Sequence, residues 1–320
     1  MARLIAWTIA AVLSSSLAWG QPYPAKPIKL VAPSTPGDAP DVIARLVADK
    51  LSPALGQQVV VENRPGAGGV VGSDYVAKAL PDGYTLIMGN AGSHGINAAV
   101  YSKLPYDIQK DFAPVSQVAV APNVMVINPS VPANSVSEFI AYAKANPGKL
   151  SYASGGNGSS AHMSMELFKS VSGIDIQHVP YKGSSPALTD VVSGQVVAFI
   201  GNMPPTVPLI KAGKLKALAV TTKSRSTLMP ELPTISEAGL PGFETVAWFG
   251  VLAPAGTPPE IVNRLSAEIA KIVKSPEMGE KLVAMGAEPV GSTPDEFRAV
   301  IDRDIAKWKP LAQKVGIKVD

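Results

Sequence analysis

Short apolar runs alternate with amphipathic segments along the first part of the chain. The runs at residues 28–31, 59–62 and 85–88 have the length and the β-branched side chains of buried strands. Between them, segments such as residues 41–51 carry apolar side chains at helical spacing. This strand–helix–strand rhythm predicts an α/β fold with a mostly parallel sheet and helices on its faces.

The rhythm changes after Pro105, where extended segments follow one another with little helix between them. The segments at residues 115–120, 123–127 and 246–252 have the pattern of strands that cross between two lobes. Two such crossovers would join two α/β lobes around a cleft, where ligands of open α/β sheets bind.

Several helix starts can be read from capping sequences. Ser135 with Glu138, Thr257 with Glu260, and Thr293 with Glu296 have the spacing of capping boxes. The last two pairs open amphipathic helices that have no strands of their own. We therefore expect the C-terminal helices to pack on the first lobe.

Two strand-to-helix turns within residues 150–190 are the strongest candidates for chemistry. In the first, a strand at residues 150–153 enters a turn rich in glycine and serine, residues 154–160. In the second, a strand at residues 176–179 leads to Ser185 and Pro186, which predict an N-cap and a first helical residue. Free N–H groups at helix N-termini bind anions, although most turns of this kind hold only water.

Composition and the N-terminal residues indicate an exported protein. Residues 1–20 have the basic start, short apolar run and small residues of a cleavable signal peptide. The chain has no cysteine, which excludes disulfides, cysteine–metal sites and lipid attachment through cysteine. After loss of Arg3 the net charge is about +2, without the clustered basic face of a nucleic-acid-binding protein. These features favour a periplasmic location for the mature protein.

The mature chain resembles, along nearly its whole length, the Bug family of periplasmic solute receptors of tripartite tricarboxylate transporters. The motifs that carry the resemblance are residues 61–69 (VENRPGAGG), 81–86 (PDGYTL), 104–107 (LPYD), 178–183 (HVPYKG), 232–237 (LPTISE) and 253–258 (APAGTP).

The resemblance implies a two-lobed type II periplasmic-binding-protein fold that closes around a small organic acid, which is then passed to a membrane permease. It places lobe 1 at residues 21–122 and 250–320, and lobe 2 at residues 123–249. It also implies that backbone groups and ordered water hold the ligand carboxylate at two loops, one in each lobe. We expect a monomer, because such a receptor presents both lobes to its transporter.

The two loops correspond to residues 33–41 and 154–162. The second fits the family pattern, whereas the first departs from it at Ser34, Asp38 and Pro40, where the family usually has an aromatic residue, a glycine and a threonine. Asp38 either caps the helix that begins near Pro40 or contacts an amine, amide or hydroxyl of the ligand. The ligand contacts predicted from these loops and from nearby strand ends are Ser34, Thr35, Gly37, Asp38, Asp41, Ser93, His94, Ser154, Gly155, Gly158, Ser159, His162, Tyr181 and Asn202.

Other functions were weighed against a receptor. The three histidines, His94, His162 and His178, do not have metal-ligand spacing, and we expect neither a metal nor a cofactor. A secreted hydrolase using Ser159 and His162 is an alternative, but the sequence around Ser159 does not fit a nucleophile elbow, so we expect no enzyme activity. A sensor that presents its ligand to a histidine kinase is a further alternative.

Overall fold

The computed structural model of the chain describes residues 23–319, and the predicted signal peptide lies outside them. Within this range the strands form one mixed sheet in the order β2-β1-β3-β9-β4-β7-β5-β6, with β8 and β10 also paired to β4. The strands are β1 (Ile28–Ala32), β2 (Val59–Asn63), β3 (Thr85–Asn90), β4 (Phe112–Ile127), β5 (Ser151–Ser154), β6 (Gln177–Pro180), β7 (Ala198–Asn202), β8 (Lys216–Val220), β9 (Val246–Pro254) and β10 (Glu288–Pro289).

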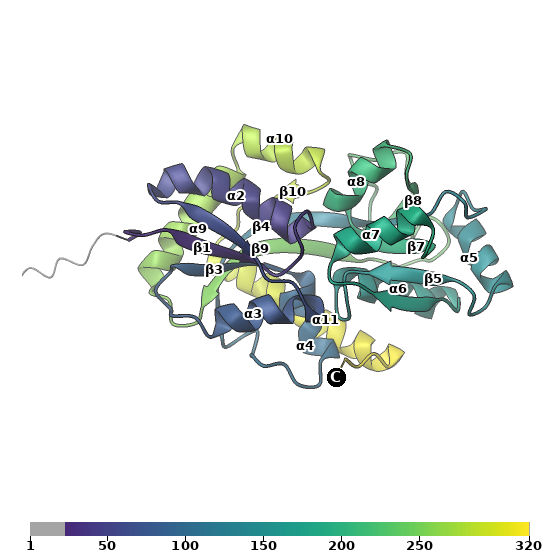
Figure 1. Cartoon of the computed structure of the whole chain (residues 1–320), viewed down its shortest axis with the longest axis horizontal. Coiled ribbons are helices and arrows are strands. Elements are labelled where there is room, and N and C mark those ends of the chain that lie inside the picture. Colours follow the sequence, from purple (N-terminus) through teal and green to yellow (C-terminus); the bar gives the residue numbers. More distant parts are fainter. Residues whose placement is uncertain (1–22, 320) are drawn as a thin grey trace, which may run out of the picture.

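Helices cover both halves of this sheet (Figure 1). They are α2 (Ala39–Leu55), η1 (Ala67–Gly69), α3 (Val70–Ala77), η2 (Gly92–Ile96), α4 (Asn97–Val100), α5 (Val136–Ala145), α6 (Ser160–Ser172), α7 (Ser184–Ser193), α8 (Met203–Lys211), α9 (Pro259–Val273), α10 (Pro276–Ala284) and α11 (Pro294–Val315). Between residues 23 and 319, none of the helices combines the length and the apolar character needed to cross a membrane.

The first lobe is built on the parallel strands β1, β2 and β3, as the alternating pattern predicted. Its core joins Leu30 of β1 and Ile43 of α2 to Leu265 and Ile269 of α9. The C-terminal helix α9 therefore packs on the first lobe, as expected for a helix with no strands of its own. These residues are buried because their side chains fall on the faces of β1, α2 and α9 that meet at the sheet.

The second lobe is built on β5, which pairs in parallel with β6 and β7. One core lies on each face of this part of the sheet. Phe139 of α5 and Phe168 of α6 pack in one core, and Leu188 of α7 packs against Phe199 in the other. The lobe is thus a second α/β layer with its own apolar interior.

Two long antiparallel strands, β4 and β9, connect the lobes (Figure 1). Their pairing runs from Phe112 opposite Pro254 to Pro122 opposite Val246. From Asn123 onward β4 pairs instead with β7 and β8. The two predicted extended segments are therefore parts of a single strand. The predicted lobe boundaries, 21–122 with 250–320 and 123–249, stay a prediction.

The predicted helix caps are only partly correct. Thr293 and Glu296 form a reciprocal capping box at α11, and the Ser135 hydroxyl accepts the N–H of Glu138 at α5. The prediction at Thr257 is wrong, because its hydroxyl donates to the carbonyl of Pro254 and α9 begins after Pro258 with no side-chain cap. The N-cap predicted at Ser185 is also wrong.

Helix α7 begins two residues earlier than the sequence predicted, with Gly183 at its N-cap and Ser184 as its first residue. The hydroxyl of Ser185 instead donates to the carbonyl of Pro36 in the first lobe, at 3.4 Å. The start of α7 is therefore shaped by contacts from the opposite lobe.

A buried cluster on α11 contributes a further contact between the lobes. Trp308 packs with Ile96 of the first lobe and Met163 of α6. The carboxylate of Asp304 accepts the indole N–H groups of both Trp308 (2.8 Å) and Trp248 of β9 (2.9 Å). Burial raises the pKa of Asp304 to about 6, although these two hydrogen bonds act in the opposite direction. Helix α11 thus touches both lobes and the crossover strand.

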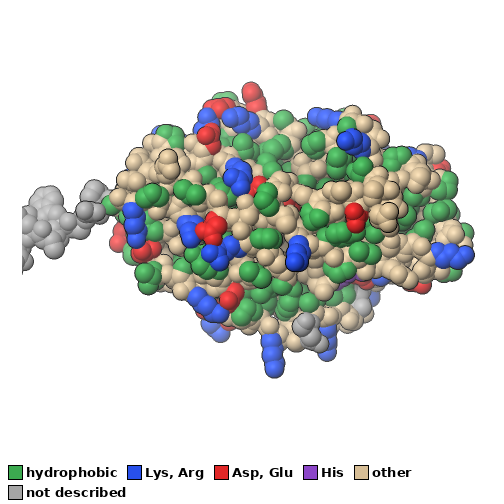
Figure 2. Space-filling model, viewed as in Figure 1, with side chains coloured by type: hydrophobic (Ala, Val, Ile, Leu, Met, Phe, Trp, Pro, Cys, Tyr) green, Lys and Arg blue, Asp and Glu red, His purple; other side chains and the backbone are tan. Residues whose placement is uncertain are grey.

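The molecular surface carries no concentrated charge on the face seen in Figure 2. Lysine and arginine side chains are scattered among acidic, neutral and apolar ones. This distribution agrees with the small net charge of the sequence and gives no electrostatic footprint for a nucleic acid on that face.

Gly250, in the middle of β9, tests the packing of α11 on the crossover strands. A Cβ atom there would lie 2.3 Å from the ring of Phe297 and 2.9 Å from the carbonyl oxygen of Ser116. Gly250→Ala should lower the free energy of unfolding by about 1–3 kcal/mol through overpacking, measured by urea denaturation.

The matched control is Gly279→Ala on α10, where a Cβ would meet no atom closer than 3.9 Å. This change should raise the free energy of unfolding by roughly 0.4–1 kcal/mol, because it reduces the freedom of the unfolded chain. Equal stability of the Gly250→Ala protein and the unmodified chain would show that α11 does not press on β9.

Candidate functional site

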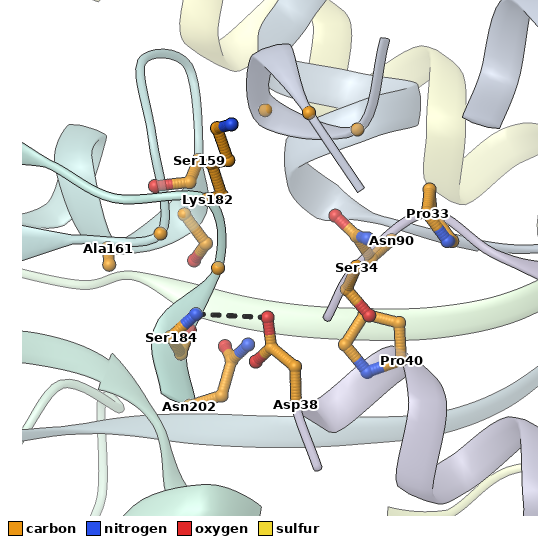
Figure 3. Close-up of a pocket in the computed structure, with 16 residues that line it drawn as sticks. Pro33, Ser34, Asp38, Pro40, Asn90, Ser159, Ala161, Lys182, Ser184 and Asn202 are labelled. Carbon is orange, nitrogen blue, oxygen red and sulfur yellow. Dashed lines mark hydrogen bonds between the residues drawn. The ribbon is translucent and has the colours of Figure 1, made fainter. Parts of the chain in front are cut away.

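A cavity of about 50 Å³ lies between the two lobes and is lined by the segments that follow the strands. A single enclosed water needs about 10–15 Å³ of such space, so the cavity has room for several waters or for part of a small polar ligand. Its lining residues are Pro33, Ser34, Asp38, Pro40, Gly66, Gly68, Gly69, Asn90, Gly155, Ser159, Ser160, Ala161, Lys182, Gly183, Ser184 and Asn202 (Figure 3).

These lining residues follow the carboxyl ends of six strands, β1, β2 and β3 in the first lobe and β5, β6 and β7 in the second. The carboxyl ends of parallel strands are the usual ligand-binding edge of an open α/β sheet. The topology therefore explains why turns far apart in sequence meet at one place.

The loop after β1 is held in shape by Asp41 on the first turn of α2. The carboxylate of Asp41 accepts the N–H of Gly37 and the side-chain amide of Asn63, both at 2.8 Å. Burial acts to raise the pKa of Asp41, but hydrogen bonds from Arg45, Gly37 and Asn63 outweigh it and lower the pKa. Asp41 is thus ionised, and its hydrogen bonds hold the loop after β1 in shape.

Asp38 occupies a different position, on the wall of the cavity, and is only 5% exposed. One carboxylate oxygen accepts the N–H of Ala39 at 2.9 Å, which makes Asp38 the N-cap of α2. The other oxygen crosses to the second lobe and accepts the N–H of Ser184 at 3.1 Å (Figure 3). Burial raises the pKa of Asp38 and the two N–H groups partly offset this.

On the opposite wall, the N-terminus of α6 points into the cavity. The Ser159 hydroxyl caps the helix by accepting the N–H of His162 at 3.2 Å. Ser160 and Ala161, the first two helical residues, both line the cavity. Amides at these positions have no acceptor within their own helix. They lie at the positive end of the helix dipole and are suited to a carboxylate.

Close backbone approach between the lobes depends on glycine at two positions. A Cβ on Gly183 would lie 2.3 Å from the Thr35 hydroxyl oxygen, and one on Gly68 would lie 2.3 Å from the carbonyl oxygen of Asn157. Both glycines also have positive φ, of +140° and +61°. The lobes are therefore in direct contact around the cavity.

Behind the α6 turn lies a stack of aromatic rings. The rings of His162 and His178 are parallel with centroids 4.1 Å apart, and Tyr152 lies on the other side of His178 at 4.9 Å. The Nδ1 atom of His162 accepts the N–H of Gly158, and a 2.6 Å hydrogen bond joins His178 to Ser154. Burial lowers the pKa of His162 to about 4 and that of His178 to about 3. Both rings are therefore neutral at physiological pH.

Of the ligand contacts predicted from the sequence, five line the cavity. These are Ser34, Asp38, Gly155, Ser159 and Asn202. The other nine are not among the lining residues, namely Thr35, Gly37, Asp41, Ser93, His94, Ser154, Gly158, His162 and Tyr181. Contact with a ligand stays a prediction for every one of them.

His94 shows how a residue at a strand end can turn inward. It is fully buried, with its ring 4.6 Å from that of Phe112 and its Nδ1 atom 2.8 Å from the Ser93 hydroxyl oxygen. Burial lowers the pKa of His94 to about 3. Its surroundings are those of a core side chain.

Sequence reasoning did not select several residues that line the cavity. Asn90 ends β3 in the same way that Asn202 ends β7, and this shared position was an available signal. The glycine turn at residues 66–69 likewise follows the carboxyl end of β2 and lines the cavity through Gly66, Gly68 and Gly69. Within residues 23–319, no group of three or more histidine, aspartate or glutamate side chains is arranged to hold a metal ion.

The two stacked histidines predict a loss of stability in acid. An unfolded histidine has a pKa near 6.5, and both folded values lie below it. The unfolded chain therefore binds more protons as the pH falls, so that stability declines from about pH 6.5 down through pH 4 and 3. His178→Phe keeps an aromatic ring in the stack but removes one titrating group.

The expected result is a flatter dependence of the melting temperature on pH between 6.5 and 3 for His178→Phe than for the unmodified chain. The difference between the two profiles removes the contribution of carboxylates common to both. Parallel profiles would mean that His178 is not kept neutral by the fold.

Comparison with known proteins agrees with this architecture. The model of the tripartite tricarboxylate transporter family receptor matches residues 43–317. The protein BugT of Bordetella pertussis is 41% identical over 298 residues, which are 93% of this chain and 91% of that protein. This confirms the family expected from the sequence motifs.

Solved structures show the same fold. The structure of R. palustris Rpa4515 with adipate has a TM-score of 0.91 at 43% identity, covering 92% of this chain and 99% of that one. MatC from Rhodopseudomonas palustris with bound malate has a TM-score of 0.87 at 34% identity, covering 90% and 99%. The two-lobed periplasmic-binding-protein fold is thereby confirmed, and the chain belongs to the family of tripartite tricarboxylate transporter receptors.

Proposed function

We propose that this protein captures a small organic acid in the cavity between its lobes and delivers it to the permease of a tripartite transporter. The observation that carries the proposal is the N-terminus of α6, whose first two residues line the cavity. Backbone N–H groups at such a terminus hold a carboxylate without a basic side chain. Lys182 is the one cationic residue among those that line the cavity, and it is exposed.

The ligands of two related structures support a carboxylate as the ligand of this protein. Rpa4515 carries adipate and MatC carries malate, and this chain is 43% and 34% identical to them. Both ligands are small organic acids. The chain shares the fold of both structures, with TM-scores of 0.91 and 0.87.

The contacts between the lobes support a mechanism of capture by closure. Asp38 accepts a hydrogen bond from Ser184, and Trp308 of α11 shares a buried apolar cluster with Met163 of α6. A ligand that touches both walls of the cavity adds to these contacts only when the lobes are together, so it shifts the population toward the closed form. The closed form is the state that would dock on the permease, with the receptor acting as a monomer in the periplasm.

The proposal includes no catalytic step. Ser159 accepts a backbone N–H as a helix cap, and the Nδ1 atom of His162 accepts the N–H of Gly158. Each group therefore has a structural role in the α6 turn. The family match, to a receptor, supports the same interpretation.

Ligand binding can be measured by thermal unfolding of the mature protein with mono-, di- and tricarboxylates. A ligand at 100 times its dissociation constant stabilises the fold by about 2.7 kcal/mol, which raises the melting temperature by several degrees. Ala161→Glu should abolish this shift, because it places a carboxylate at the first turn of α6, where a negative charge is locally favourable, and fills the cavity.

The matched control is Ser170→Glu, which adds the same charge on an exposed position of the same helix. It should keep the full ligand shift. If the Ala161→Glu protein folds and still shows the shift, the ligand is held elsewhere. If no carboxylate shifts the unmodified protein, the proposed function is wrong.

A further inference from the structure

Two helix N-termini, those of α6 and α7, face the cavity from the second lobe. They differ in whether a carboxylate of the protein already accepts their first amides. At α6, Ser160 and Ala161 line the cavity and their amides have no acceptor in their own helix. At α7, the first amide, that of Ser184, donates to Asp38 at 3.1 Å. One of two similar anion sites is therefore already filled by a carboxylate of the protein itself.

Asp38 also places two carboxyl oxygens on the cavity wall. It is 5% exposed, and both of its oxygens accept a backbone N–H, which partly offsets the rise in its pKa that burial causes. Each carboxylate oxygen retains a further lone pair. A second carboxylate brought against this wall would be repelled by the ionised form of Asp38, whereas a hydrogen-bond donor would find an acceptor in either form.

Two further polar groups near Asp38 lack partners. Ser34 is 7% exposed and lines the cavity, and its hydroxyl has no hydrogen-bond partner among residues 23–319. The Oδ1 atom of Asn202 is likewise buried without a partner within that range, and Asn202 lies beside Asp38 on the same wall (Figure 3). Buried polar groups are normally satisfied, and their cost when unpaired is about 1–3 kcal/mol. These groups point to a polar ligand at this wall.

We propose that Asp38 is a specificity-determining residue that fills the α7 anion site, so that the cavity selects a monocarboxylate whose other end is a hydrogen-bond donor. This inference rests on the proposed function, since it assumes that the ligand carboxylate lies at the N-terminus of α6. The donor is an ammonium, a primary amide or a hydroxyl, which gives a hydrogen to Asp38 and meets Ser34 and Asn202. A plain dicarboxylate offers no hydrogen to this wall and is repelled by the ionised form of Asp38.

The test uses matched probes that differ only at one end. At a four-carbon and a six-carbon length, these are succinate, succinamate, 4-aminobutanoate and 4-hydroxybutanoate, and adipate, adipamate, 6-aminohexanoate and 6-hydroxyhexanoate. Dissociation constants are measured by calorimetry with the mature protein. At the length that fits, at least one donor-bearing acid should bind tenfold or more tightly than the dicarboxylate.

Two variants test whether Asp38 causes the preference for a donor-bearing acid. Asp38→Asn removes the charge at nearly constant size, and Asp38→Gly also frees the amide of Ser184. Both should lose the preference, and Asp38→Gly should bind the dicarboxylate at least tenfold more tightly than the unmodified protein does. Asp49→Asn removes an exposed carboxylate from the same helix and should leave all dissociation constants unchanged. Melting without ligand verifies that each variant is folded.

The outcomes separate this inference from the proposed function. If the unmodified protein binds a dicarboxylate best, or if its preference survives in both Asp38 variants, the role of Asp38 is overturned while the receptor function stands. If neither the unmodified protein nor Asp38→Gly binds any of the acids, the carboxylate site itself is overturned. A donor preference that the two variants abolish establishes the inference.

Discussion

The antiparallel pairing of β4 with β9 is the interaction on which the cavity depends. These strands run side by side from the first lobe to the point where β4 changes partner, between Pro122 and Asn123. Because β3 pairs with β9 and β7 pairs with β4, the sheets of both lobes are fixed to the same two strands. This strand pairing therefore brings together the loops that follow the strands, although these loops lie far apart in the sequence.

Within that frame the cavity is lined by main chain more than by reactive side chains. Glycine at positions 68 and 183 lets the backbones of the two lobes touch, since any Cβ there would overlap the opposite loop. Helix α6 offers first-turn amides that have no acceptor in their own helix, whereas α7 offers an amide already bonded to Asp38. One wall thus has the polarity for an anion, and the other carries a carboxyl group of its own.

Much of the fold could be predicted from the sequence, because strands and helices follow the local periodicity of apolar residues. The crossovers and the turns after the strands were predictable for the same reason. The start of α7 was not, because Asp38, 146 residues away, supplies the acceptor for Ser184. Nor could the sequence tell that His94 is buried against Phe112 while Asn90, four residues earlier, lines the cavity. Such distinctions depend on tertiary contacts.

The cluster around Asp304 gives the protein an intrinsic fluorescence signal. The chain has four tryptophans, and Trp7 and Trp19 fall in the predicted signal peptide. The two that follow it, Trp248 and Trp308, donate to the same carboxylate, and Trp308 shares a buried apolar cluster with Met163 of the second lobe. Separation of the lobes would expose the indole of Trp308 to water and make its surroundings more polar. The emission spectrum of the unlabelled mature protein would therefore follow opening and closing in real time.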